Sequence, residues 1–184
     1  CCAVKHSTPC GVAVGSSALE TYKKTFECDP VSIFGGIIGM NFKVDAATAE
    51  ELNRTFLEIV MAPDFDADAL DILKKKKNLR IIKIKNAVSD KQTWVKIDGG
   101  ILVQDNDNQF SEDIQTVTVF KPTAQQEKAL LFAQRVVKYV KSNAIVVSNG
   151  FQALGIGGGQ VNRIWATQHA VERAKEKFSG DLVL

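Results

Sequence analysis

The segment VKHSTPCG, residues 4–11, places a lysine, a histidine, a proline and a cysteine between two short apolar runs at 1–4 and 11–14. Gly15, Ser16 and Ser17 follow and favour a helix that begins at Ala18. We therefore expect a strand, a loop that carries reactive side chains, and a helix over 18–26. The positive charges of Lys5 and His6 disfavour each other, which favours a neutral His6 that can act as a base near neutral pH.

The bulk composition limits the class of protein. The chain has 184 residues, of which 45% are hydrophobic, enough for one sizeable core or two small lobes. With 23 basic and 21 acidic side chains, the net charge of +2 provides no field that argues for nucleic acid or a membrane. No apolar run reaches the length of a membrane span. All four cysteines lie within the first 28 residues without regular spacing, so we expect reduced thiols and a cytoplasmic protein.

Hydrophobic periodicity predicts an α/β chain in which strands alternate with helices. A helix over 48–62 is indicated by a capping box at Thr48 and Glu51, and one over 123–141 by a second box at Thr123 and Gln126. Further helices are expected at about 66–77 and 161–177, strands at 33–39, 79–84, 100–103, 116–120 and 144–147, and connections at 86–98 and 104–113. The lysines at 74–77 suit a helix C-terminus, and the lack of interleaved aromatics favours a solvated face over a nucleic-acid site.

A glycine-rich run at 155–159 precedes the last expected helix and resembles a phosphate site. Glycines allow backbone amides to turn toward an anion, and a helix N-terminus carries unpaired N–H groups. Arg163 adds a forked donor in the first turn. Gln160 stands where the dinucleotide fingerprint requires a glycine, and no P-loop lysine follows, so a tightly packed structural turn remains the alternative.

Four other residues or groups have ordinary structural interpretations that compete with functional ones. His6 with Pro9 and Cys10 raises the possibility of a zinc-dependent nucleoside deaminase, but the chain has no His-x-Glu segment, and Gly-Val-Ala follows Cys10 without the second cysteine of a Pro-Cys-x-x-Cys segment. Asn143 could cap a helix, and Glu58 could face solvent from its expected helix. His169, on the last helix, reads as a surface or boundary residue.

The segment at 4–13 resembles the Val-Lys-His-x-Asn-Pro-Cys/Ala-Gly motif of the AICAR transformylase domain family of bifunctional purine biosynthesis proteins. Seven further segments resemble that family in its order: DPVSIFGGIIG (29–39), EIVMAP (58–63), LKKKKNLR (73–80), GGILVQ (99–104), KPT (121–123), VKSNAIVV (140–147) and GIGGGQVNR (155–163). The resemblance covers essentially the whole chain, with Thr8 where the family usually has asparagine.

The resemblance implies an α/β fold of the cytidine deaminase-like type: a three-layer αβα arrangement with a mixed sheet, in two related subdomains. Residues 1–120 would form the first subdomain with its connections, and 121–184 the start of the second. The implied activity is transfer of a formyl group from 10-formyltetrahydrofolate to the 5-amino group of AICAR in purine (IMP) biosynthesis, without a metal, by a homodimer with shared active sites. The chain lacks the family's cyclohydrolase domain and its C-terminal folate-covering stretch, so we expect this piece alone to be weakly active or inactive.

Roles carry over position by position from the resemblance. Lys5, His6 and Asn143 match the catalytic residues. The residues matched to substrate binding are Phe34, Gly35 and Glu58 for the nucleotide, Arg163 and the loop Gly157, Gly158 and Gly159 for its phosphate, and Ile164 for the folate. A non-catalytic nucleotide-binding or dimerisation module is the alternative from another class, and the zinc deaminase is the third.

Overall fold

The computed structural model describes residues 1–85, 90–110, 114–178, 180 and 182–184. The chain divides into two compact units. One comprises residues 1–85 and 122–184, and the other comprises residues 86–121. They are described separately below.

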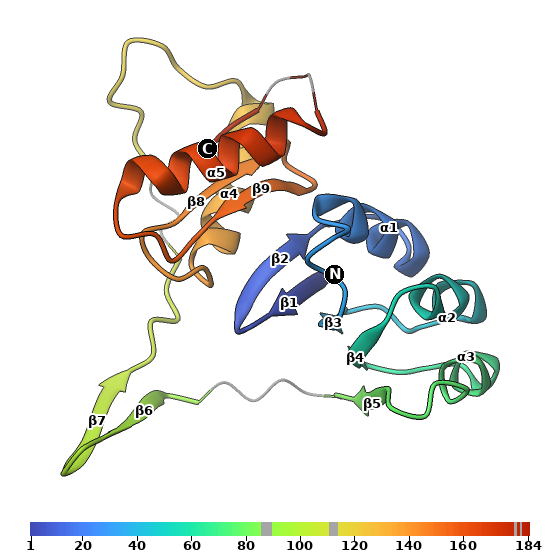
Figure 1. The fold of residues 1–184 in the computed structure, drawn as a ribbon. Coiled ribbons are helices and arrows are strands. Elements are labelled where there is room, and N and C mark those ends of the chain that lie inside the picture. The colour runs from blue at the N-terminus through green and yellow to red at the C-terminus, as the bar shows by residue number, and fades with distance from the viewer. Residues whose placement is uncertain (86–89, 111–113, 179, 181) are drawn as a thin grey trace. The chain divides into compact units, whose positions relative to one another are not determined.

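A five-stranded sheet in the order β2-β1-β3-β4-β5 forms the first half of the larger unit. Its strands are β1 (Cys2–Lys5), β2 (Thr8–Val12), β3 (Gly36–Gly39), β4 (Leu57–Ala62) and β5 (Arg80–Lys83), and its helices are α1 (Ala18–Cys28), α2 (Ala46–Asn53) and α3 (Ala67–Leu73). Strand β1 is antiparallel to β2 and β3, whereas β3, β4 and β5 are parallel, so the sheet is mixed. The three helices lie side by side (Figure 1). Between helices and sheet lies a core that includes Tyr22, Ile33, Ile38, Leu52, Val60 and Leu73.

The second half of the larger unit is a β-ribbon between two helices. It contains α4 (Ala124–Val137), β8 (Ile145–Ser148), β9 (Ala153–Gly157) and α5 (Arg163–Lys175). Val146 packs with α4, while its neighbour Val147 packs with α5, because successive strand side chains point to opposite faces. This half is therefore a three-layer αβα arrangement, and the mixed α/β class expected from the sequence is confirmed.

A hairpin is the regular structure of the smaller unit. Strands β6 (Gln92–Ile97) and β7 (Gly100–Asp105) pair antiparallel around Asp98 and Gly99. Every residue in both strands is exposed. Strand β7 confirms the strand expected at 100–103. Strand β6 lies where the sequence indicated only a polar connection, and no strand occurs among the described residues expected to form one at 116–120.

The helix expected over 48–62 is wrong. Helix α2 covers only Ala46–Asn53, and Leu57–Ala62 form strand β4 between β3 and β5. The side chain of Asp45, and not a capping box at Thr48, accepts the N-terminal hydrogen bond, from the Thr48 backbone N–H at 2.8 Å. Pairing within the sheet makes this segment a strand: Val60 is fully buried between two parallel strands, and β-branched residues such as Ile59 and Val60 favour strands.

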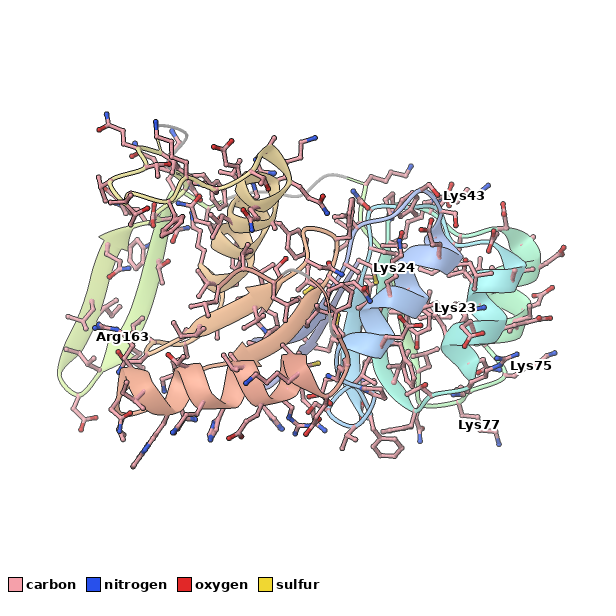
Figure 2. The ribbon with its side chains drawn as sticks, turned by 90° about the horizontal axis from the view of Figure 1, so that it is seen from above. Lys23, Lys24, Lys43, Lys75, Lys77 and Arg163 are labelled. Carbon is pink, nitrogen blue, oxygen red and sulfur yellow. The ribbon has the colours of Figure 1, made fainter. Side chains whose placement is uncertain are left out.

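Other helices match their expected starts. Ser17 caps α1, and Thr123 and Gln126 form the predicted capping box of α4. Helix α3 ends at Leu73, before the lysine run. In Figure 2, Lys75 and Lys77 extend outward from this end of the unit.

Helix α5 lies unusually close to strand β9, because small residues face each other across the contact. Ala166, Ala170 and Ala174 are fully buried at helical spacing on α5. A Cβ atom at Gly155 would lie 1.9 Å from the Ala170 carbonyl oxygen, and one at Gly157 would lie 2.1 Å from the Ala166 carbonyl oxygen. Both glycines are thus required by packing. The structural explanation of the glycine run holds for these two positions.

We expect Gly155→Ala to lower the free energy of unfolding by about 3 kcal/mol, because the added methyl group overlaps helix backbone that has no side chain to move aside. Gly39→Ala is the matched control, since its Cβ would meet only Met61 Cε at an ordinary 3.8 Å. The control should change stability by no more than about 0.5 kcal/mol. Urea unfolding of both variants measures the difference, and equal stabilities would contradict the packing argument.

Candidate active site

Lys5 and His6 lie at the tight turn of the β1–β2 hairpin. Strand β1 ends at Lys5, which pairs with Thr8, so His6 and Ser7 form a two-residue connection. Both connecting residues have positive φ, 52° and 62°, as a type I′ turn requires. Side chains other than glycine, asparagine and aspartate seldom occupy this region, and such strained positions cluster at functional sites.

The turn is next to Phe34 and Gly35, which precede β3. Lys5 Nζ donates a hydrogen bond of 2.7 Å to the Phe34 carbonyl oxygen. Gly35 has φ 70°, and its N–H donates to the Phe56 carbonyl oxygen at 2.8 Å. The rings of Phe34 and Phe56 lie 5.3 Å apart, and both residues are partly exposed to solvent. Two residues matched to nucleotide binding thus adjoin the Lys5–His6 pair.

Glu58 lies on the next strand, at the same end of the sheet. Gly36 pairs with Leu57, and Ile59 pairs with Arg80, so the starts of β3, β4 and β5 are level. The Glu58 carboxylate forms an ion pair with Arg80 Nη1 at 2.8 Å. Its expected place on a helix is wrong, but the strand brings it to the edge that carries Phe34 and Gly35.

A cleft of about 620 Å³ joins the hairpin to the second half of the same unit. Lys5, His6, Gly158 and Gly159 all line it, so the paired basic residues and the glycine turn face one space. The other lining residues are Thr8, Pro9, Cys10, Cys28, Asp29, Ser32, Lys141, Ala153, Gly155, Ile156, His169, Glu172, Arg173, Glu176 and Lys177.

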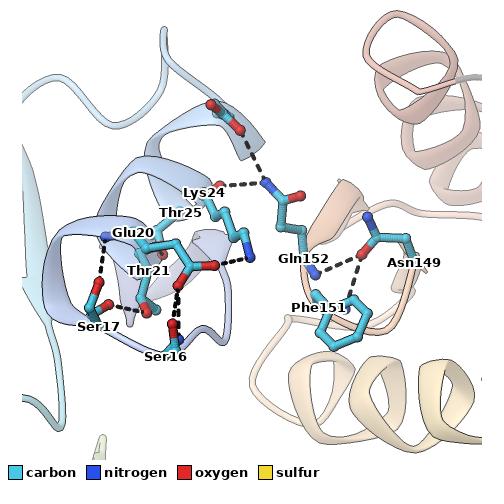
Figure 3. Close-up of polar contacts among 10 residues, drawn as sticks. Ser16, Ser17, Glu20, Thr21, Lys24, Thr25, Asn149, Phe151 and Gln152 are labelled. Carbon is cyan, nitrogen blue, oxygen red and sulfur yellow. Dashed lines mark hydrogen bonds and ion pairs between the residues drawn. The ribbon is translucent and has the colours of Figure 1, made fainter.

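A small set of backbone and side-chain contacts holds the two walls of the cleft together. Ala13, just after β2, forms a bridge with Gln152, just before β9, and the Val14 N–H donates to the Phe151 carbonyl oxygen at 2.8 Å. Figure 3 shows the Gln152 side chain reaching α1, where Nε2 donates to the Lys24 carbonyl oxygen at 2.9 Å. At the far end of α1, Lys177 Nζ donates to the Cys28 carbonyl oxygen.

Asn143 lies next to the glycine turn. Its backbone N–H and its side-chain Nδ2 both donate to the Gln160 carbonyl oxygen, at 3.1 and 3.0 Å. The Gly159 N–H donates to the Lys141 carbonyl oxygen at 2.5 Å, and Gln160 Nε2 donates to the Gly158 carbonyl oxygen at 3.2 Å. These bonds tie the loop after α4 to the loop after β9, beside the cleft.

Arg163 and Ile164 do not line the cleft of their own chain. Arg163 is in the first turn of α5 and exposed (Figure 2), ahead of the part of the helix that faces the cleft. Ile164 is 67% exposed beside it. Gly157 also lies outside the cleft, under α5. The structure therefore brings together the Lys5–His6 pair and the end of the glycine run, but not these three residues.

One wall of the cleft was missed by sequence reasoning. His169 and Arg173 lie four residues apart on α5, Lys177 follows the end of the helix after another four residues, and all three line the cleft. His169 was expected to be a surface or boundary residue, and it is exposed, but it also lines the cleft, so both histidines of the chain face the same space. The spacing by four was the available signal.

Two basic side chains of this wall affect the pKa of an acidic group next to α1. Burial opposes ionisation of Asp29, but hydrogen bonds from Ser32 and the charges of Arg173 and Lys177 outweigh it and lower the pKa of Asp29. Burial raises the pKa of the Cys10 and Cys28 thiols to about 11. Both thiols are therefore protonated near neutral pH, which suppresses nucleophilic chemistry. All four cysteines are unpaired.

Among the described residues, no group of three or more histidine, cysteine, aspartate or glutamate side chains could hold a metal ion. In the same part of the chain, no helix is both long and apolar enough to cross a bilayer.

The fold and the site define a mixed α/β protein with a basic pair on a hairpin turn that faces a glycine-rich strand end. A family model described as AICARFT/IMPCHase bienzyme matches residues 1–173, and the chain belongs to this family. The bifunctional purine biosynthesis protein PurH of Fusobacterium nucleatum subsp. nucleatum is 60% identical over 185 residues, which cover 100% of this chain and 37% of that protein.

Two clostridial relatives with the same name give similar values. The protein of Clostridium botulinum strain Hall is 59% identical over 174 residues, and that of Clostridium perfringens strain SM101 is 58% identical over 175 residues. Each match covers 95% of this chain and 35% of the relative. The chain thus spans little more than a third of the length of the curated relatives it matches.

The lowered pKa of Asp29 predicts a pH dependence of stability. A carboxylate whose pKa is lower in the folded state stabilises the fold above its unfolded value, near 3.8, and this contribution is lost as the pH falls through the folded value. Asp29→Asn keeps an oxygen that can accept from Ser32 but removes the charge, so it should flatten the acid limb of a plot of stability against pH below about 5. Asp71→Asn, on exposed α3 surface, is the control. The same slope in Asp29→Asn and the wild type would refute the assignment.

Proposed function

We propose that the site built on Lys5 and His6 catalyses transfer of a formyl group from 10-formyltetrahydrofolate to the 5-amino group of AICAR, as a step of purine biosynthesis. The observation that carries the proposal is that both residues and the Gly158–Gly159 turn line one cleft, in a chain of the AICARFT/IMPCHase bienzyme family.

The amine of AICAR is a weak nucleophile, because its lone pair is delocalised into the imidazole ring and the carboxamide. Its nitrogen forms a bond to the formyl carbon, and His6 accepts the proton that the amine loses. The bond from the formyl carbon to the folate N10 then breaks, and that nitrogen takes up a proton. This sequence needs neither a metal nor a covalent enzyme intermediate.

Lys5 assists as a positive charge next to the base. It stabilises the negative charge that develops on the formyl oxygen, or delivers the proton to the departing folate nitrogen. Its hydrogen bond to the Phe34 carbonyl oxygen fixes the ammonium group beside the segment that would meet the AICAR ring. Asn143, tethered to Gln160, holds the formyl group in position for attack.

The remaining matched residues bind the two substrates. Phe34 and Gly35 contact the base with backbone groups, Glu58 contacts the nucleotide, and Gly158 and Gly159 at the end of the glycine run receive the phosphate with Arg163. Near Ile164, the exposed side chains of Val161 and Trp165 offer an apolar surface that fits the flat rings of a folate.

The active form is a homodimer in this proposal. Arg163 and Ile164 lie outside the cleft of their own chain, which is where residues that serve the site of a second copy would lie. The family resemblance supports sites shared between copies, with AICAR and folate as the ligands and no nucleic acid or membrane partner.

Removal of the imidazole should abolish most of the turnover. His6→Asn is preferable to alanine, because asparagine tolerates the positive φ of the turn. We expect AICAR-dependent release of tetrahydrofolate, measured with the full-length protein that contains this sequence, to fall roughly 10²- to 10⁴-fold, the usual contribution of a general base. Ser7→Gly, at the other turn position, should keep full activity. Unchanged turnover in His6→Asn, with AICAR still bound, would favour the non-catalytic nucleotide-binding module.

Loss of the lysine tests the charge next to the base. Lys5→Ala should lower kcat by roughly 10²-fold, since it removes a cation that acts on charge developing during the reaction. Lys23→Ala is the matched control, because Lys23 is exposed on α1. Steady-state kinetics with both substrates measures the effect. Equal kcat values in the two variants would exclude a catalytic role for Lys5.

A further inference from the structure

We propose that Arg80, together with Glu58, forms a donor–acceptor pair that recognises the primary carboxamide of the substrate, so that Arg80 is a specificity-determining residue. The inference rests on the proposed function, because it takes AICAR as the ligand. None of the roles carried over from the resemblance involves Arg80.

The placement of Arg80 comes from the strand register. Gly36 and Leu57 pair across β3 and β4, and Ile59 and Arg80 pair across β4 and β5. The Lys5–His6 turn ends the antiparallel neighbour of β3, so it projects from the same edge. Arg80 therefore stands in one row with the proposed base and with the proposed nucleotide contacts.

The geometry of the ion pair leaves groups available to a ligand. One guanidinium nitrogen, Nη1, contacts Glu58 Oε2 at 2.8 Å. The side chains of Arg80 and Glu58 are 63% and 44% exposed. A guanidinium carries five N–H donors and a carboxylate two oxygens, so one contact uses only part of the capacity of each.

A primary carboxamide presents the complementary pattern. Its carbonyl oxygen accepts a hydrogen bond and its NH₂ group donates two, side by side in one plane. Arg80 can donate to the oxygen while Glu58 accepts from the NH₂ group. A carboxylate in place of the carboxamide would have no N–H to offer and would be repelled by Glu58, so the pair selects the amide.

The surroundings support a ligand at this edge rather than an isolated surface ion pair. Phe34 and Phe56 are 59% and 41% exposed, and their rings lie 5.3 Å apart next to the start of β4. Exposed aromatic side chains provide a flat surface for a heterocycle. An ion pair that is exposed to solvent contributes little to the free energy of folding. A contribution to stability is therefore a weak explanation for the Glu58–Arg80 pair.

The test compares two ligands with several variants of the full-length chain. Binding of AICAR and of the analogue without the carboxamide, 5-aminoimidazole ribonucleotide, is measured by calorimetry. We expect Arg80→Gln to weaken AICAR binding about tenfold or more while affinity for the analogue is unchanged, because only AICAR loses a charged hydrogen bond. Arg80→Lys keeps the cation beside Glu58 but not the planar fork, and it should weaken AICAR binding in the same selective way.

Arg54→Gln is the matched control. Arg54 is also exposed, with a side chain 74% accessible, and it forms a 3.0 Å ion pair with Glu51 at the end of α2. The control should bind both ligands as the wild type does. Equal weakening of both ligands by Arg80→Gln, or no weakening of either, would overturn the inference.

This outcome is separable from that of the proposed function. Loss of turnover in His6→Asn with no effect of Arg80→Gln on AICAR binding would retain the formyl transfer and reject the carboxamide pair. Selective weakening by Arg80→Gln in a chain without formyl transfer would do the reverse.

Discussion

The contact between β2 and β9 is the constraint on which the site depends. Ala13 and Gln152 bridge the edge of the five-stranded sheet to the ribbon, and Gln152 Nε2 adds a bond to the Lys24 carbonyl oxygen within α1. Residues at positions 5–10 and 153–177 share one cleft only because these contacts hold. The bonds are few, and each contributes modestly. The shape of the cleft therefore also depends on how closely α5 packs against strand β9 of the ribbon.

That closeness comes from the contact of α5 with β9. Gly155 and Gly157 allow the helix backbone to approach the strand, and this fixes which side of α5 faces the hairpin. The glycine run therefore has two parts with different physical roles. Gly155 and Gly157 pack against α5, whereas Gly158 packs beside Val140, where a Cβ atom would lie 2.3 Å from Val140 Cγ1. Gly158 and Gly159 line the cleft, and the Gly159 N–H donates to the Lys141 carbonyl oxygen.

The features that the sequence predicted well are local ones. Ser17 and Thr123 cap helices with hydrogen bonds that span three residues, so the pattern is present within a short window. Residues 57–62 are mostly apolar, and such a run is compatible with a buried helix or a buried strand. Pairing with β3 and β5 makes this segment a strand. The α5 wall with His169 follows the same logic. Its spacing was visible in the sequence, but the space it faces depends on contacts between residues far apart in the chain.

The sequence named candidate site residues but gave no arrangement for them. Lys5, Phe34 and Glu58 lie far apart in the sequence, yet the structure places them at one edge, because a hairpin turn and the starts of two parallel strands share that edge. At such an edge the regular ladder ends and backbone groups become available, so side chains there can be varied without loss of the sheet. The fully buried core, with Val60 and Ile38 at its centre, holds the strands level. The starts of these strands are therefore held in register, and this fixes where the backbone of an edge residue such as Arg80 lies.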